Sequence, residues 1–102
     1  MKKTIYFSKR AKIKLRNLLE YLESKWSVRI REKFISKLDG SIEQICMFPE
    51  SCLESENFPG IRKCVVTRQT SLYYRINEGV IEVITLIDNR QDPDKLKAEL
   101  GL

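Results

Sequence analysis

Three β-rich runs joined by very short connections constrain the fold of this chain most strongly. The runs are IRKCVVT (residues 61–67), SLYYRI (71–76) and VIEVITLI (80–87), all rich in β-branched or aromatic side chains. Only RQT and NEG join them, and such short connections leave no room for a crossover helix. Gly79 supplies the positive φ that a tight hairpin needs. The C-terminal half therefore predicts an antiparallel three-stranded meander.

Two amphipathic helices are predicted before the meander. Apolar residues recur at helical spacing through residues 11–26, after Ser8, a residue type that caps helix N-termini. Ser27 is a second candidate cap, and the helix that follows has an apolar stripe of Phe34, Leu38, Ile42 and Ile45. Pro49 closes this second helix. Because the connection after Lys25 is so short, we expect the helices to pack antiparallel as a hairpin.

The whole chain is predicted to form one α+β domain, residues 1–102. A short β-type run, KTIYF (3–7), comes first, the helical hairpin follows, and a loop over residues 49–60 leads into the meander. The length suits a single domain, and the sequence contains no internal repeat. The last run, DKLKAEL (94–100), has two interpretations, a short helix or a mobile tail.

Composition excludes several kinds of chemistry. The chain has no histidine, which excludes histidine-dependent triads and histidine metal sites. The spacing of Cys46, Cys52 and Cys64 matches no common zinc pattern, so we expect reduced, packed thiols and neither a metal nor a cofactor. No apolar run has the length of a signal-peptide core or a membrane span. We therefore expect a cytoplasmic protein without a membrane partner.

Positive charge is concentrated in the N-terminal part of the chain. Residues 1–37 contain 12 Lys and Arg against 3 acids, and residues 38–102 contain 7 against 11. Such a positive face attracts phosphate backbones or an acidic protein segment. An ordinary solvated helix face is the alternative interpretation of the same charge pattern.

Basic residues on the predicted strands form a candidate site. Arg90 and Asp88 follow the last strand, while Arg62, Lys63 and Arg75 lie on the two strands before it. Adjacent residues of a strand point to opposite faces, so only one of Arg62 and Lys63 shares the face of the site. We favour Arg62.

Other residues near this site have alternative interpretations. Arg75 either contributes to the site or forms a salt bridge with Glu82. Tyr73 either stacks on a base or packs in the core, whereas Tyr74 is expected in the core. Trp26, at the corner of the helical hairpin, is expected to pack rather than to bind.

The order and spacing of these elements resemble the RelE/ParE superfamily of toxins from bacterial toxin–antitoxin pairs. The resemblance covers nearly the whole chain and rests on the basic helical hairpin, the aromatic strand LYYRI, and the apolar last strand followed by Arg90 and Asp92. It implies a growth-arresting cytoplasmic toxin with a part in plasmid stabilization. It also implies a cognate antitoxin protein as partner.

The resemblance implies two modes of action. ParE-like members bind and block DNA gyrase, our leading hypothesis, and the residues assigned to target or nucleic-acid binding are Lys63, Arg68, Tyr73, Asp88 and Arg90. RelE-like members cut messenger RNA on the ribosome without a metal. In that case Arg62, Arg75 and Arg90 would be catalytic, because arginine forks hold the scissile phosphate and stabilise the charge of the transition state.

The end of the last strand departs from the nuclease pattern. Many RNA-cutting members have a doubly basic motif there, at positions that are Asp88 and Asn89 in this chain. Ser71 stands just before the apolar core of the third strand, where nuclease members often have an arginine. These departures favour binding over cleavage, although enzymatic activity stays open. A third possibility is a non-toxic nucleic-acid-binding derivative that uses the basic helical half.

Overall fold

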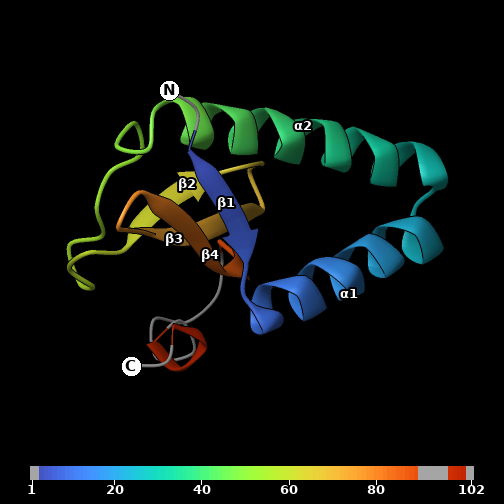
Figure 1. The fold of residues 1–102 in the computed structure, drawn as a ribbon. Helices are drawn as coiled ribbons and strands as arrows, with labels where there is room; N and C mark the ends of the chain where they lie inside the picture. The colour runs from blue at the N-terminus through green and yellow to red at the C-terminus, as the bar shows by residue number, and fades with distance from the viewer. Residues whose placement is uncertain (1–2, 90–96, 101–102) are drawn as a thin grey trace.

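The structure is a computed structural model, and it describes residues 3–89 and 97–100. It is the predicted α+β fold, with a short first strand, two helices and a meander (Figure 1). The elements in chain order are β1 (Thr4–Phe7), α1 (Lys9–Lys25), α2 (Val28–Met47), β2 (Arg62–Val65), β3 (Thr70–Asn77) and β4 (Val80–Asp88).

All four strands form one sheet in the order β1-β4-β3-β2. The meander strands pair antiparallel, as predicted, and β1 adds to β4 in parallel. Glu78 and Gly79, with φ of 50° and 80°, make the tight turn between β3 and β4. Positive φ at both central positions is the geometry that suits the twist of a two-residue hairpin.

Two serines start the helices, as the sequence predicts. The hydroxyl of Ser27 accepts a hydrogen bond from the backbone N–H of Ile30 at 3.1 Å, and that of Ser8 accepts one from Ala11 at 3.0 Å. Ser8 also donates a 2.6 Å hydrogen bond to the carbonyl oxygen of Ile84. Since Ile84 lies in β4, this one hydroxyl fixes the start of α1 against the sheet.

The two helices form the predicted antiparallel hairpin, but it is V-shaped, and the helices do not lie side by side along their length (Figure 1). Trp26 and Ser27 join the helices, which meet at this corner and spread apart toward the sheet (Figure 1). Neither helix carries an apolar stretch long enough to cross a bilayer, as far as the described residues go.

The two faces of the sheet are covered differently. Alternate residues of β3 and β4 point to the helices and build the main core, whose fully buried members include Leu72, Tyr74, Ile81 and Val83. The opposite face carries a smaller cluster of Ile61, Tyr73, Ile87 and Leu100. We call these the helix side and the open side of the sheet.

A β-bulge interrupts the regular alternation of β4. Tyr73 is paired with Thr85, but the next residue, Tyr74, is paired with Val83, so Ile84 is skipped. Ile84 consequently packs against the open-side cluster. Alternation alone does not predict this shift, because a bulge has no periodic signature in the sequence.

The C-terminal residues close part of the open side. Residues 97–99 are helical, which matches the helical alternative for this stretch in its described part. Glu99 pairs with Arg10 at 2.9 Å and with Lys14 at 2.6 Å, and Leu100 is buried in the open-side cluster. The segment is thus tied to the first turns of α1 while it covers the sheet.

Candidate binding site

The sheet register separates the cations that the sequence places in one site. Arg62 is paired with Tyr74, which faces the helices, whereas Lys63 is paired with Tyr73 on the open side. Arg75 alternates with Tyr74 and therefore also lies on the open side. Arg62 and Arg75 thus lie on opposite faces of the sheet, and the expectation that they converge is wrong. Lys63, not Arg62, shares the face of Arg75.

Both arginines are already engaged. Arg62 is half-buried, and its Nη1 donates to the carbonyl oxygens of Cys52 at 2.7 Å and Glu50 at 3.4 Å. Arg75 Nε donates to the Glu82 carboxylate at 2.6 Å, because these residues are direct cross-strand neighbours. The salt-bridge interpretation of Arg75 is therefore confirmed. Arg90, the third residue of the predicted catalytic set, and Asp92 lie outside the described residues.

The two adjacent tyrosines of β3 are both buried. Tyr73 is only 5% exposed, and burial raises its pKa above the ordinary value. Its ring therefore presents no free face for stacking, contrary to the assignment of Tyr73 to target binding. Tyr74 lies in the core, as predicted, and its hydroxyl donates a 2.6 Å hydrogen bond to the Pro49 carbonyl oxygen. Burial also raises the pKa of Tyr74.

Asn89 explains the polar end of the last strand. Its side-chain amide donates to the carbonyl oxygen of Arg68 at 2.8 Å, and its backbone N–H donates to that of Gln69 at 2.8 Å. The hydroxyl of the fully buried Ser71 donates a hydrogen bond to the side-chain oxygen of Asn89. Asn89 and Ser71 therefore hold the turn that presents Arg68.

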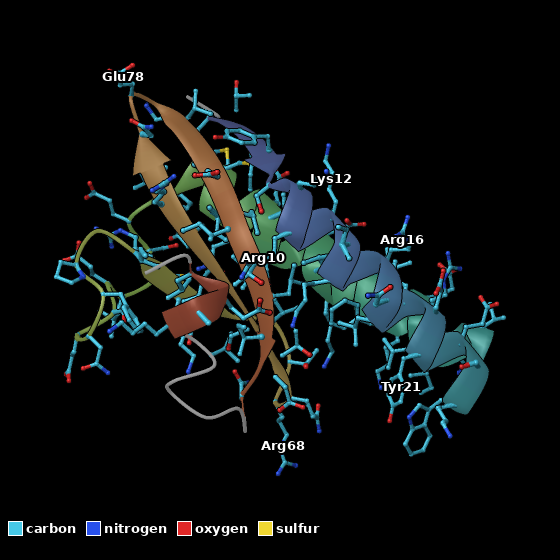
Figure 2. All side chains as sticks on the ribbon, turned by 90° about the horizontal axis from the view of Figure 1, so that it is seen from below. Arg10, Lys12, Arg16, Tyr21, Arg68 and Glu78 are labelled. Carbon is cyan, nitrogen blue, oxygen red and sulfur yellow. The ribbon has the colours of Figure 1, made fainter. Side chains whose placement is uncertain are left out.

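A groove of about 1150 Å³ opens between the helical hairpin and this end of the sheet. Its lining includes Arg68 and Tyr21, both labelled in Figure 2, and Asp88 at the end of β4. Its apolar lining includes Leu18, Leu22, Phe34, Leu86 and Ile87. Its four cations, Lys14, Lys33, Lys37 and Arg68, outnumber its single acid, Asp88. We refer to this feature as the hairpin groove.

Exposed aromatic and aliphatic side chains line the groove at the hairpin corner. Trp26 is 68% exposed, Tyr21 52% and Ile30 38%. The expectation that Trp26 packs is wrong, because the helices diverge from the corner and leave nothing to cover its ring. The sequence carries a signal for Tyr21, which lies outside the Leu15, Leu18, Leu22 stripe of α1. Trp26, four residues after Leu22, continues that stripe by spacing, so the sequence gives no sign of its exposure. Exposed apolar patches of this kind mark interaction sites.

The remaining basic residues of α1 point elsewhere. Lys12 and Arg16 lie on the side of the helix away from Tyr21 (Figure 2), as expected from a 100° rotation per residue. Arg10 is held by Glu99 and by the carbonyl oxygen of Ala98 at 3.0 Å. Across residues 3–89 and 97–100, no group of three or more His, Cys, Asp or Glu side chains could hold a metal ion.

Comparison with known proteins identifies the family. Residues 5–93 match the family model described as the ParE toxin of the type II toxin-antitoxin system, parDE. The chain belongs to the ParE toxin family. This match confirms the RelE/ParE resemblance and identifies the chain as a toxin of a type II toxin–antitoxin system. Among curated protein sequences, none matches the chain significantly.

Three solved structures similar to this ParE-family toxin share its fold. The chromosomal ParDE system of P. aeruginosa has a TM-score of 0.72 and 11% identity, covering 84% of this chain and 95% of that one. A mutant of the E. coli toxin RelE in the free state has a TM-score of 0.65 and 18% identity, covering 99% of this chain and 96% of that one. The YoeB dimer from Staphylococcus aureus has a TM-score of 0.58 and 15% identity, covering 89% of this chain and 100% of that one. At these identities the comparison extends to the fold alone.

Proposed function

We propose that this toxin arrests growth by binding its target, with DNA gyrase as that target, rather than by cutting RNA. One observation carries the proposal: the two described arginines of the candidate nuclease site lie on opposite faces of the sheet, each with a partner. Phosphodiester cleavage needs cations that converge on one phosphate, so this arrangement does not favour it. The ParE family match supports the gyrase mode.

The groups available for proton transfer also favour binding over RNA cleavage. Cleavage of RNA by its 2′-hydroxyl needs groups that accept and donate a proton near neutral pH. The sequence has no histidine, and burial raises the pKa of both tyrosines on β3, so they stay protonated. Tyr74 is further held by its bond to Pro49.

The hairpin groove suits a neutralising antitoxin helix. Apolar side chains inside the groove and cations around it are complementary to an amphipathic helix with acidic residues. The exposed Trp26 and Tyr21 would anchor the apolar face of that helix, as aromatic residues do at binding hot spots. We therefore assign the groove to a helix of the cognate antitoxin.

This assignment also explains neutralisation. Arg68 and Asp88 remain proposed target-binding residues, together with Lys63 and Arg90, and the first two line the groove. An antitoxin helix in the groove would cover them. Antitoxin and target would then compete for one surface, in the cytoplasm, where gyrase acts.

The test compares two activities of the purified toxin. Supercoiling by gyrase should fall as toxin is added, messenger RNA on translating ribosomes should stay intact, and added antitoxin should restore supercoiling. Arg68→Ala should weaken inhibition about tenfold, as expected when a charged contact is lost. Lys12→Ala, on the far side of α1, is the matched control. Codon-phased RNA cuts with normal supercoiling would replace this proposal with the endoribonuclease mode.

A further inference from the structure

Two cysteines face each other beside the outer edge of the sheet. Residues 53–55 run antiparallel to the outer edge of β2, and the backbone N–H of Lys63 donates to the Leu53 carbonyl oxygen at 3.1 Å. One residue beyond this hydrogen bond, on each segment, stand Cys52 and Cys64. The antiparallel register therefore brings these two residues directly opposite each other.

This position suits a disulfide. Residues next to a hydrogen-bonded pair form the closer, non-hydrogen-bonded pairs of an antiparallel ladder, with Cα atoms about 4.5 Å apart. Disulfides span Cα separations of roughly 4.4 to 6.8 Å. Both side chains point to the helix side, since Cys64 is part of the main core and Cys52 packs against that core. Both are free thiols in the structure.

The two thiols differ in access to solvent. Cys52 is half-buried, whereas Cys64 is 5% exposed. Burial and, secondly, a hydrogen bond with the Cys52 side chain raise the pKa of Cys64 to about 12. An oxidant in solution therefore reaches Cys52 first, and Cys64 is the resolving thiol.

We propose that Cys52 and Cys64 form a reversible oxidation site whose disulfide fastens the 49–60 loop to the edge of β2. With a peroxide as oxidant, the Cys52 thiol takes one peroxide oxygen to give the sulfenic acid and one water. The sulfur of Cys64 then attacks the sulfur of Cys52, its proton leaves with the displaced hydroxide as a second water, and the S–S bond forms. A dithiol reverses the reaction by exchange.

The disulfide would change the accessibility of a sheet edge. In the reduced chain, backbone hydrogen bonds hold residues 53–55 on β2, so this cover can detach. In the oxidised chain the cover is covalent, and no partner strand can add to β2. This inference does not depend on the identity of the toxin's target.

Oxidation of the full-length purified toxin tests the site. Hydrogen peroxide should lower the intact mass by about 2 Da, the mass of the two hydrogens lost, and peptide mapping should find the Cys52–Cys64 link. The melting temperature should rise by about 10 to 20 °C. Dithiothreitol should restore the mass and the lower melting temperature. Because burial raises the pKa of Cys64, the rate of disulfide formation should rise with pH above neutrality.

Matched cysteine variants make the result decisive. Cys52→Ser should abolish the mass loss, whereas Cys46→Ser, which removes the third thiol, should leave it unchanged. The proposal is overturned by a link through Cys46, by only intermolecular disulfides, or by the same mass loss in Cys52→Ser. Since Cys52 is half-buried, its serine variant keeps the test informative even where Cys64→Ser does not fold.

Discussion

The two faces of the sheet are built on the same strands but held by different means. The helix side buries Leu72, Tyr74, Ile81 and Val83 completely beneath two helices. The open side relies on a smaller cluster that, in the described part of the chain, Leu100 and Phe58 help to cover, and the Arg75–Glu82 salt bridge lies on the same face. The groove at the end of the helix side, which is the proposed binding surface, stays open and basic.

The largest expected difference concerns the main core. Leu72→Ala should lower the free energy of unfolding by about 3 to 5 kcal/mol, because a fully buried leucine leaves a cavity that two helices and a sheet cannot fill. Urea denaturation of the variant and the wild type measures this loss. A loss below about 1 kcal/mol would show that the helix side is not the tighter face.

The cover of the open side should matter less. Leu100→Ala should lower the free energy of unfolding by about 2 kcal/mol, since its cluster is small and can relax around the cavity. The same denaturation experiment applies, with Ala98→Gly, an exposed site in the same segment, as control. A loss equal to that of Leu72→Ala would remove the contrast between the faces.

Tyr73 and Tyr74 are neighbours on β3, and their variants allow the two faces to be compared within one strand. Tyr74→Phe should cost about 1 kcal/mol, because the Pro49 carbonyl oxygen loses its hydrogen-bond donor. Tyr73→Phe should stay within about 0.5 kcal/mol of wild type, since its hydroxyl makes no hydrogen bond within the described part of the chain. Thermal unfolding of both variants decides the order, and the reverse order would show that the hydrogen bond from Tyr74 to Pro49 contributes nothing to stability.

The smallest effect is expected at the salt bridge. Arg75→Ala should change stability by no more than about 0.5 kcal/mol, because the arginine side chain is 53% exposed and solvent screens the pair. The double variant with Glu82→Ala isolates the coupling between the two side chains. Growth arrest should also persist in the Arg75→Ala variant. If this variant lost both growth arrest and an RNA cleavage seen with the wild type, the nuclease mode would be favoured.

Residues on the strands show why the site was only partly predictable. Alternation correctly separated Arg62 from Lys63, yet it could not tell which of them shares a face with Arg75. That choice depends on the register between β2 and β3, which a single strand does not encode. Asn89 was predictable as part of a polar tip, but its hold on the turn before β3 depends on a contact with Arg68, 21 positions away in the chain.

The hairpin groove was missed for a related reason. Each helix was predictable from its cap and apolar stripe, but the angle between the helices comes from their packing on the sheet. That angle decides whether Trp26 is covered.

The elements, their order, the tight turn at Gly79 and the membership of the family all follow from the sequence alone. These features obey short-range rules, namely side-chain periodicity, capping and backbone sterics. Four others required the folded chain: the parallel addition of β1, the bulge at Ile84, the opposite faces of Arg62 and Arg75, and the facing pair Cys52 and Cys64. Each of these depends on which distant segments minimise exposed apolar area together, and local patterns carry no record of that choice.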